Sequence, residues 1–324
     1  MTPFRAAAAA LLAACVGLVA AGAAAQSTGY PNRAVRIVVG FPAGSGNDLI
    51  ARAVGTRLGE VWKQPVIVEN KVGASGVIGA ESVARAAPDG YTLLLTGSSH
   101  LIQAAVAGKG PYRAVDDFTP VSTVGGGPLV LIVNTALAAR SVPELIALGK
   151  SRPLTYGSAG TGTSPHIAGE MFARQAGISM THVPYKGSAP AQTDLIGGQV
   201  QMVFQVIQVA LPAIRNGQVR ALAVTGAKRL PDLPDVPTMT EMGLPEASLE
   251  LWWGLLAPAG LPADVLRTLN EAVRQAVAHA EVQQKLGNAG LIAGSSTPEG
   301  FLATMRRDFD GFAKLVAAVG IKPD

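Results

Sequence analysis

Short runs of β-branched and other apolar residues alternate along the chain with longer segments whose apolar positions recur at helical spacing. Such runs predict buried strands, and the segments between them predict amphipathic helices. The predicted strands cover residues 35–40, 65–70, 91–97, 129–134, 154–159, 180–185, 200–205, 220–225, 249–257 and 291–294. Because regular alternation of strands and helices is typical of parallel sheets covered by helices, the pattern predicts an α/β fold.

Start signals mark several of the helical segments. Ser141 and Glu144 have the spacing of a capping box. Thr163 or Ser164 can cap a later helix that has Pro165 in its first turn. These signals and the apolar spacing predict helices at about 47–61, from 142, at 164–176, at 263–287 and at 297–320.

Two interruptions of this pattern suggest a division into lobes. Three glycines break the alternation within residues 122–129, and a proline-rich segment follows near residue 230. So many strands exceed the comfortable width of one sheet. We therefore predict two lobes, one made of residues 26–125 and 229–324 and the other of residues 126–228. Two chain crossings would join them, with hinges near 124–129 and 224–230.

The N-terminus has the three-part pattern of a secretory signal peptide, with Arg5, a long apolar run and small residues up to Ala25. We predict cleavage after Ala25, which leaves a soluble periplasmic chain from residue 26 onward. An alternative is that the segment ending at Cys15 is a lipobox, which would make Cys15 a lipidated first residue. Cys15 is the only cysteine, so a chain cleaved after Ala25 has no disulfide and no thiolate nucleophile.

Charge and composition narrow the possible partners. The chain has 26 Lys and Arg residues against 22 Asp and Glu, and the basic residues are scattered with few aromatic residues beside them. A nucleic-acid groove is therefore not expected. No histidine pair at ligand spacing and no HExxH motif occurs, so we predict no metal and no cofactor.

Three loops rich in glycine and hydroxyl residues follow predicted strands and lead into predicted helices, at residues 41–48, 96–100 and 156–166. Open α/β sheets bind ligands beyond the carboxyl ends of their strands. Glycine lets the backbone approach a ligand, and the unpaired N–H groups at a helix N-terminus favour an anion. Three such loops around one cleft would hold a small anion without an arginine.

Each loop also has a purely structural interpretation. A glycine-serine connection between a strand and a helix is commonly only a tight turn. Asp48 can serve its own helix as a first-turn acid instead of contacting a ligand. His166 can be a ligand donor or a packing residue, and the residues leave both open. A secreted hydrolase that uses Ser45 or Ser164 with His166 is an alternative, although no G-x-S-x-G elbow is present.

Several long segments resemble one known family. They include "VRIVVGFPAGSGNDLIAR", "VGASGVIGAESVARAAPDGYTLLL", "LTYGSAGTGTSPHIAGEMF" and "HVPYKGSAPAQTDLIGGQV", which occur in this order. The chain is similar to the Bug (TctC-like) periplasmic solute-binding proteins of tripartite tricarboxylate transporters. The resemblance implies a two-lobed type II Venus-flytrap receptor. Such a receptor closes on a small organic acid and delivers it to membrane permease subunits. It is not an enzyme, and we expect a monomer.

The resemblance places the ligand carboxylate at loops 41–48 and 158–166. Together with the third loop, the predicted ligand-binding residues are Phe41, Pro42, Ala43, Gly44, Ser45, Gly46, Asp48, Ser98, Ser99, Ser158, Ala159, Gly160, Thr161, Gly162, Thr163, Ser164, His166, Tyr185 and Gln205. Two positions depart from the family pattern. Ser45 separates Gly44 from Gly46, where the family has adjacent glycines, and Gln205 stands where the family usually has an acid. Without that acid a ligand ammonium loses its partner, so we expect a plain carboxylate or an aromatic acid rather than an amino acid.

Overall fold

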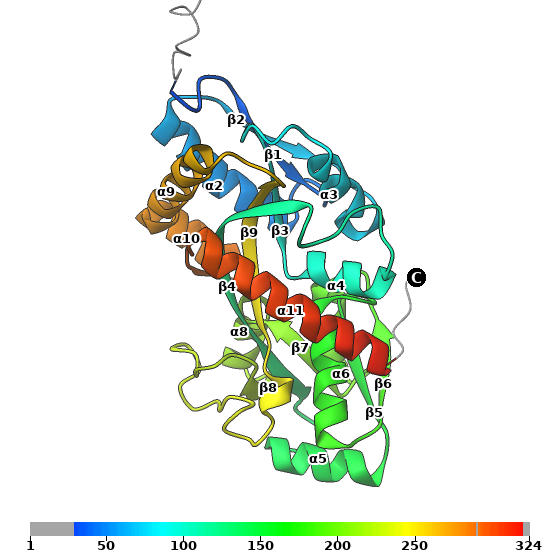
Figure 1. The fold of residues 1–324 in the computed structure, drawn as a ribbon. Coiled ribbons are helices and arrows are strands. Elements are labelled where there is room, and N and C mark those ends of the chain that lie inside the picture. Colours follow the sequence, from blue (N-terminus) through cyan, green and yellow to red (C-terminus); the bar gives the residue numbers. More distant parts are fainter. Residues whose placement is uncertain (1–28, 290, 320–324) are drawn as a thin grey trace, which may run out of the picture. The chain divides into compact units, whose positions relative to one another are not determined.

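The computed structural model describes residues 29–289 and 291–319, and it arranges their ten strands as two sheets that share one long strand (Figure 1). Every strand and helix that the structure describes lies in the compact unit formed by residues 33–324. The predicted signal peptide, with its cleavage position at Ala25 and the alternative lipid site at Cys15, lies outside the described residues.

The first sheet has the strand order β2-β1-β3-β9-β4, and β10 pairs with β4. The strands are β1 (Val35–Val39), β2 (Val66–Asn70), β3 (Thr92–Gly97), β4 (Phe118–Asn134), β9 (Glu250–Pro258) and β10 (Ile292–Ala293). β1 runs parallel to β2 and β3, as predicted, but β9 runs antiparallel to both β3 and β4. The α/β fold is therefore confirmed, but its first sheet is mixed and not all parallel. β9 follows the second sheet in sequence and re-enters the first from the opposite direction.

The second sheet continues from β4 in the order β4-β7-β5-β6, with β8 also paired to β4. Its strands are β5 (Leu154–Ser158), β6 (Met180–Pro184), β7 (Met202–Val206) and β8 (Val219–Val224). β5 is parallel to β6 and β7, whereas β4 is antiparallel to β7 and β8. All ten predicted strands are present, and all except β4 have nearly the predicted bounds.

Strand β4 differs most from its prediction. Residues 122–129 were expected to interrupt the pattern, yet they form the middle of a continuous strand that pairs with β9 up to Pro128 and with β7 and β8 from Leu129. The glycines allow close backbone approach instead of breaking the strand. A Cβ added to Gly126 would lie 2.3 Å from the carbonyl oxygen of Leu251. The passage from one sheet to the other is thus made within a strand.

Helices cover both sheets (Figure 1). They are α2 (Gly46–Trp62), α3 (Val77–Ala84), α4 (Ser99–Ala107), α5 (Val142–Ser151), α6 (Ser164–Ala176), α7 (Ser188–Ile196), α8 (Ile207–Arg215), α9 (Ala263–Ala278), α10 (Ala280–Ala289) and α11 (Pro298–Val319), with short turns η1 (Ala74–Gly76) and η2 (Pro245–Ala247). The predicted cap at Ser141 is observed, since its hydroxyl accepts from the Glu144 N–H group, whereas Thr163 is the N-cap residue of α6 but its side chain forms no capping hydrogen bond.

The helix predicted over 263–287 is in fact two helices. His279 has an extended backbone (φ −74°, ψ 132°) and ends α9, after which α10 begins at Ala280. Helical spacing alone did not reveal this break, because the apolar positions continue on both sides. The change in direction lets Val282 and Leu286 become buried while α10 packs against α2.

The core of the second sheet follows the period of two expected for a strand buried on both faces. Leu129, Leu131 and Val133 of β4 belong to one apolar cluster, which also contains Phe172 of α6. Val130 and Ile132 face a separate cluster. In that second cluster β4 meets apolar residues of α7 and α8. The long helix α11 packs along β4 and α4 (Figure 1).

Thr225 ties together the two places where the chain passes between the sheets. Its hydroxyl accepts from the Leu129 N–H group at 2.8 Å and donates to the Leu249 carbonyl at 2.6 Å. Its backbone N–H group donates to the Leu129 carbonyl at 2.9 Å, and the residue is fully buried. One side chain thereby fixes β4 against the segment that leads into β9.

We expect Thr225→Val to lower the free energy of unfolding by about 1–3 kcal/mol, because it keeps the side-chain shape but leaves a buried N–H and a buried carbonyl without a partner. Urea denaturation measures the change. Thr119→Val is the matched control, since Thr119 of β4 is half-buried and its hydroxyl bonds only one carbonyl, at 3.1 Å. Equal effects of the two substitutions would contradict the role given to Thr225.

Candidate functional site

A cavity of about 500 Å³ lies where loops of the two sheets meet. Loops that follow β1, β2 and β3 reach it from the first sheet, and loops that follow β5 and β6 reach it from the second. The lining residues are Phe41, Ser45, Gly46, Asn47, Ser75, Gly97, Ser98, Ser99, Gln103, Ala159, Thr163, Ser164, Pro165, Gly187, Ser188, Val206, Leu251 and Trp253. All three predicted loops therefore border one cavity.

The first loop presents the N-terminus of α2 to the cavity. Ser45 is the N-cap, and its hydroxyl accepts from the Asp48 N–H group. The N–H groups of Gly46 and Asn47 have no acceptor within the part of the chain that the structure describes. The side-chain Oδ1 of Asn47 accepts from the indole N–H of Trp253 at 2.6 Å, which fixes the Trp253 side chain at the cavity wall. Two backbone donors and the amide of Asn47 are thus available there.

Asp48 stabilises the first loop through three hydrogen bonds. Its carboxylate accepts from the Gly44 N–H group, from Nε of Arg52 and from Nδ2 of Asn70, each at 2.9 Å. The Arg52 guanidinium, helped by the Gly44 and Asn70 donors, lowers the pKa of Asp48 to about 2 although the side chain is only 2% exposed. The residue does not line the cavity. Asp48 therefore stays ionised, and its charge stabilises the loop instead of facing the cavity.

The second loop presents the N-terminus of α6. Thr163 is the N-cap residue, but its hydroxyl donates to the Gly160 carbonyl at 2.7 Å instead of capping the helix. The Ser164 N–H group has no acceptor among residues 29–289 and 291–319. Ala159, Thr163, Ser164 and Pro165 line the cavity. The loop therefore offers backbone and hydroxyl groups to the same space as the first loop.

Two histidines support the second loop from below. Nδ1 of His166 accepts from the Gly162 N–H group at 3.0 Å, and Nε2 of His182 lies 2.6 Å from the Ser158 hydroxyl. The two rings stack with centroids 3.9 Å apart. His166 was predicted as either a ligand donor or a packing residue. The structure places it outside the cavity lining and 5% exposed, as a support of the loop.

The third loop contributes the start of α4. Ser98 and Ser99 line the cavity, and the Ser98 hydroxyl accepts from the Trp252 N–H group at 2.9 Å. His100, expected in a loop, is instead a buried residue of the first turn of α4, where Nε2 lies 2.9 Å from the Ala114 carbonyl. Burial lowers the pKa of His100 to about 4, so the ring is neutral at physiological pH.

Several lining residues were not predicted from the sequence. These are Asn47, Ser75, Gly97, Gln103, Pro165, Gly187, Ser188, Val206, Leu251 and Trp253. Ser75 and Ser188 follow β2 and β6 in glycine-containing loops, so the rule that found the other loops also applies to them. Gln103 lies inside a helix and Trp253 inside a strand. No local signal distinguishes them.

The loop that carries Ser75 has an unusual backbone. Ala74 and Ser75 both have positive φ angles, 45° and 53°, which non-glycine residues seldom adopt. Gly76 lies directly against Gly40, because a Cβ added to Gly40 would be 2.5 Å from its Cα. Such strain persists only where the surroundings enforce it, and it is common at binding sites.

Other predicted residues lie behind the lining. Gln205 is fully buried, and its side chain donates to the Ser188 carbonyl at 3.0 Å and accepts from the Val206 N–H group. The Tyr185 hydroxyl donates to Asp194 at 2.8 Å, and burial raises its pKa to about 12. The remaining predicted residues outside the lining are Pro42, Ala43, Gly44, Ser158, Gly160, Thr161 and Gly162.

The lining contains no Asp, Glu, Lys, Arg or His among the described residues. Its polar groups are hydroxyls, side-chain amides and helix N-termini, while Phe41, Pro165, Val206, Leu251 and Trp253 supply apolar surface. Helix N-termini carry a partial positive charge, so such a space favours an anion with a small carbon skeleton. Within residues 29–289 and 291–319, no three His, Cys, Asp or Glu side chains gather as they would around a metal ion.

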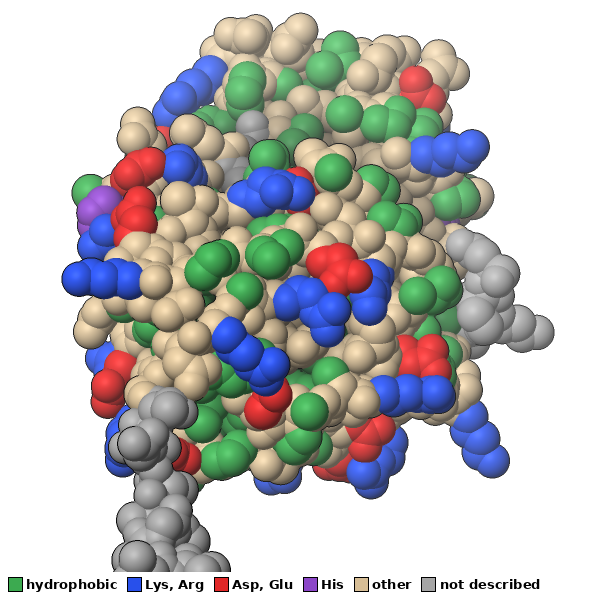
Figure 2. Space-filling model, turned by 90° about the horizontal axis from the view of Figure 1, so that it is seen from above, with side chains coloured by type: hydrophobic (Ala, Val, Ile, Leu, Met, Phe, Trp, Pro, Cys, Tyr) green, Lys and Arg blue, Asp and Glu red, His purple; other side chains and the backbone are tan. Residues whose placement is uncertain are grey.

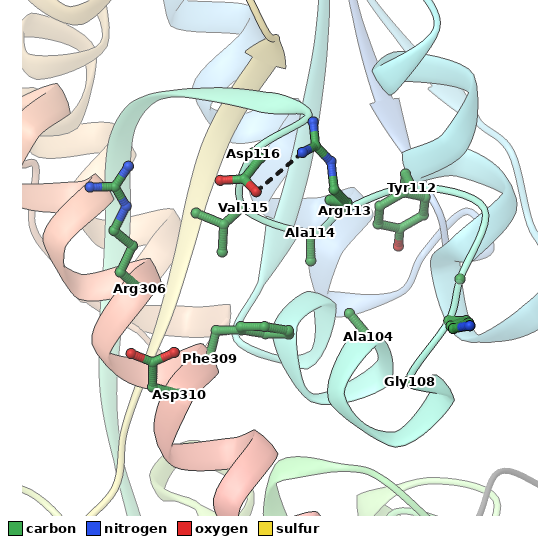
Figure 3. A pocket seen from close by; sticks show the side chains of 12 residues that line it. Ala104, Gly108, Tyr112, Arg113, Ala114, Val115, Asp116, Arg306, Phe309 and Asp310 are labelled. Carbon is green, nitrogen blue, oxygen red and sulfur yellow. Dashed lines mark ion pairs between the residues drawn. The ribbon is translucent and has the colours of Figure 1, made fainter.

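A second cavity, of about 700 Å³, lies between the segment after α4 and helix α11 (Figure 3). Arg113 on its rim pairs with Asp116 at 3.5 Å and Asp117 at 2.7 Å. Arg306 and Asp310 of α11 stand on the opposite side (Figure 3). None of the three loops reaches this space, so we place the candidate site at the smaller cavity.

Charges of both signs are mixed on the surface of the molecule that Figure 2 shows. On the face shown in Figure 2, Lys and Arg side chains are interspersed with Asp and Glu. That face offers no continuous basic groove of the kind that tracks a phosphate backbone. No helix in the described part of the chain is both long and apolar enough to cross a membrane.

Two sheets joined by a shared strand, with a cavity of neutral donors where their loops meet, define a two-lobed solute-binding protein. The profile of the tripartite tricarboxylate transporter receptors (TctC) matches residues 50–297, so the chain belongs to this family. The resemblance to the Bug proteins is confirmed: the chain is 35% identical to protein BugT of Bordetella pertussis, over 90% of this chain and 91% of BugT.

Solved structures confirm the two-lobed periplasmic-binding-protein fold. A protein of R. palustris solved with adipate is 33% identical, with a TM-score of 0.77 over 91% of this chain and 100% of that one. MatC of Rhodopseudomonas palustris, solved with bound malate, is 31% identical, with a TM-score of 0.75 over 89% of this chain and 100% of MatC. The family is described as a receptor family and not as a family of enzymes.

We expect Asp48→Asn to lower the free energy of unfolding by about 2 kcal/mol at pH 7, because the native pKa lies about two units below the unfolded value. The charge of Asp48 stabilises the fold above about pH 4, and this contribution is lost as the pH falls from about 4 to about 2. The difference between the two proteins should therefore shrink on acidification, which urea denaturation at pH 7, 5 and 3 measures.

Asp232→Asn is the control for this experiment, because Asp232 forms an ion pair with Arg215 in which both side chains are more than half exposed. Exposed pairs contribute little, so we expect a change below about 1 kcal/mol. A loss for Asp48→Asn that stays constant down to pH 3 would contradict the assignment of its charge to the loop.

Proposed function

We propose that this protein is an extracytoplasmic receptor that captures a small organic acid between its two lobes and delivers it to a tripartite transporter in the membrane. The observation that carries the proposal is the cavity whose described lining has helix N-termini and hydroxyls from both sheets but no ionisable side chain. The adipate and malate present in two related structures support a carboxylate ligand. The volume of the cavity, about 500 Å³, is within the range of about 300–1,000 Å³ common for small-molecule sites.

The donors suit a carboxylate placed between the starts of α2, α4 and α6. The N–H groups of Gly46, Asn47 and Ser164 have no acceptor in the described residues, so a ligand carboxylate would meet donors that are already oriented. Hydrogen bonds to a charged acceptor are stronger than neutral ones. The apolar residues Leu251 and Trp253 would then contact the carbon skeleton. The charge of Asp48 does not oppose the ligand, because Arg52 and Gly44 already bind it.

A plain carboxylate fits this cavity better than an amino acid. A ligand ammonium group needs a carboxylate partner when water is excluded, and no Asp or Glu is present in the described lining. Gln205 affects this choice only indirectly, because it is buried behind Ser188 and contacts the backbone. We therefore propose ligands such as dicarboxylates or aromatic acids, and not their amino derivatives.

Binding would involve closure of two lobes, 26–125 with 229–324 and 126–228, about hinges near 124–129 and 224–230. Thr225 lies in the second hinge segment and is bonded to Leu129 in the first, which supports this placement. Nε2 of Gln103 on α4 lies 3.4 Å from the carbonyl of Gly162, so a side chain of the first lobe already meets a loop of the second. The bounds of the two lobes and their closure on the ligand are both part of this proposal.

The geometry does not favour a hydrolase. His166 does not line the cavity; its Nδ1 accepts from the Gly162 N–H group, and its Nε2 lies 3.8 Å from Glu170. The Ser45 hydroxyl accepts from the Asp48 N–H group. A nucleophilic serine needs a base within hydrogen-bond reach, and these serines have none in the described residues.

We expect Gly46→Asp to weaken binding of the ligand at least tenfold, because a fixed negative charge would lie where the carboxylate is held. A Cβ at Gly46 meets no atom within 4 Å, and an acid in the first turn favours the helix, so the fold should be retained. A thermal-shift screen of organic acids and their amino analogues identifies the ligand, and calorimetry then measures its affinity.

Gly46→Asn is the matched control, since it has nearly the same size as Gly46→Asp without the charge. We expect it to keep most of the affinity. Equal binding by the two variants would remove the α2 terminus from the site. A screen in which amino acids stabilise the protein more than their deaminated analogues would reverse the proposed ligand class.

Delivery is tested with membrane vesicles that contain the two permease subunits of a tripartite transporter. We expect uptake of the identified acid when the wild-type protein is added and much slower uptake at the same ligand concentration when Gly46→Asp is added. Binding without uptake, together with stimulation of a membrane sensor, would make the protein a sensory receptor instead. Mass spectrometry of the exported protein distinguishes a chain that begins at Gln26 from one lipidated at Cys15.

A further inference from the structure

The loop between β5 and α6 is held by two stacked imidazole rings that no ligand would touch. His166 of α6 and His182 of β6 have ring centroids 3.9 Å apart and planes inclined by 12°. His166 is buried, and His182 is half-buried. Each ring is linked to one glycine of the loop, His166 to Gly162 directly and His182 to Gly160 through Ser158.

The two links differ in how they tolerate a proton. The Ser158 hydroxyl both accepts from the Gly160 N–H group at 3.1 Å and lies 2.6 Å from Nε2 of His182. A hydroxyl can rotate, so it can donate to a neutral His182 or accept from a protonated one. Its hydrogen also has another acceptor, the Gly160 carbonyl at 3.0 Å. Protonation of His182 therefore leaves this part of the loop in place.

His166 has no such freedom. The Gly162 N–H group is a donor only, and it points at Nδ1 from 3.0 Å. Nδ1 can accept this bond only while it carries no proton. A protonated His166 would set two N–H groups against each other, and the loop or the ring would have to move. The bond between Gly162 and His166 therefore requires the neutral ring with its proton on Nε2.

The groups around His166 set the balance between its two forms. Glu170 of the same helix lies 3.8 Å from Nε2 and favours the charged ring, and this carboxylate is itself bonded by the Tyr156 hydroxyl of β5. Burial opposes the charge, as does a proton on His182 of β6, because two stacked cations repel. Glu170 of the helix, Tyr156 of β5 and His182 of β6 are thus titratable groups that surround His166.

Gly162 links this support to the cavity. Its N–H group rests on His166, while its carbonyl accepts from Gln103 of the opposite lobe at 3.4 Å. Thr163 and Ser164, the next two residues, line the cavity. Release of Gly162 would therefore disturb both the cavity wall and a contact between the lobes.

We propose that His166 is a positioning residue whose neutral Nδ1 holds the ligand loop through Gly162, so that protonation of His166 releases the loop and weakens ligand binding. This inference rests on the proposed function for its effect on affinity, but the link between His166 and Gly162 exists in the free protein. Mild acid would thus favour unloading of the receptor.

The test compares the wild-type protein with His166→Asn, whose Oδ1 takes the place of Nδ1 as an acceptor and does not titrate. Calorimetry with the same organic acid between about pH 8 and pH 5 cancels the titration of the ligand itself. We expect the affinity of the wild type to fall roughly tenfold more than that of the variant over this range. His166→Leu, which has no acceptor, should bind weakly at every pH, and parallel pH profiles of wild type and His166→Asn would overturn the proposal.

Nitrogen NMR of the ligand-free protein supplies a second measurement that needs no ligand. We expect the ring nitrogens of His166 and the amide of Gly162 to titrate together, while the amide of Gly160 follows His182 weakly. The proposal is overturned if the chemical shift of the Gly162 amide stays unchanged while the His166 ring takes up a proton. It is also overturned if the His166 ring stays neutral until the protein unfolds. If no organic acid binds at any pH, the proposed function fails, and the NMR result still decides the role of His166.

Discussion

One strand, β4, connects the two sheets, and the position of every loop at the cavity depends on it. Residues up to Pro128 pair with β9 in the first sheet, and those from Leu129 pair with β7 and β8 in the second. The strand can lie this close to β9 because Gly126 has no side chain. Thr225 then bonds to β4 at Leu129 and to the returning segment at Leu249. With both crossings fixed in this way, the helix N-termini of the two sheets face the same space.

A site whose described lining has no ionisable side chain avoids the cost of removing water from a charged residue. An arginine in a closed cleft must itself lose water, whereas backbone N–H groups at a helix start are already oriented and carry only partial charge. The one acid next to the first loop, Asp48, is neutralised by Arg52 and by the Gly44 N–H group on the side away from the cavity. The same side chain thus gives the loop its shape and keeps its charge away from the ligand position.

The supports of the loops are as specific as the loops themselves. Asp48, His166 and Gln205 each bind the backbone of a segment that borders the cavity, at Gly44, Gly162 and Ser188. Such second layers hold the groups that would touch a ligand in place before it arrives. Such supporting residues can also make the site respond to solution conditions such as pH without contacting a ligand. Of these three contacts, the bond from Gly162 to Nδ1 of His166 is the one that the proposed response to pH invokes, because a protonated Nδ1 cannot accept it.

Local pattern by itself determined the strands, the starts of α2, α5, α6, α9 and α11, and the three predicted loops that border the cavity, because capping, periodicity and glycine-rich strand ends depend on residues close together in the sequence. It did not determine that residues 122–129 continue as a strand, since that depends on β9, more than a hundred residues away in the sequence. Nor did it separate Ser164, at the cavity, from His166, two residues later and buried beneath the loop. Gln103 and Trp253 reach the cavity from a helix and a strand with no local signal. Side-chain direction and long-range pairing arise only when the two sheets pack, which is why the tertiary structure alone decided them.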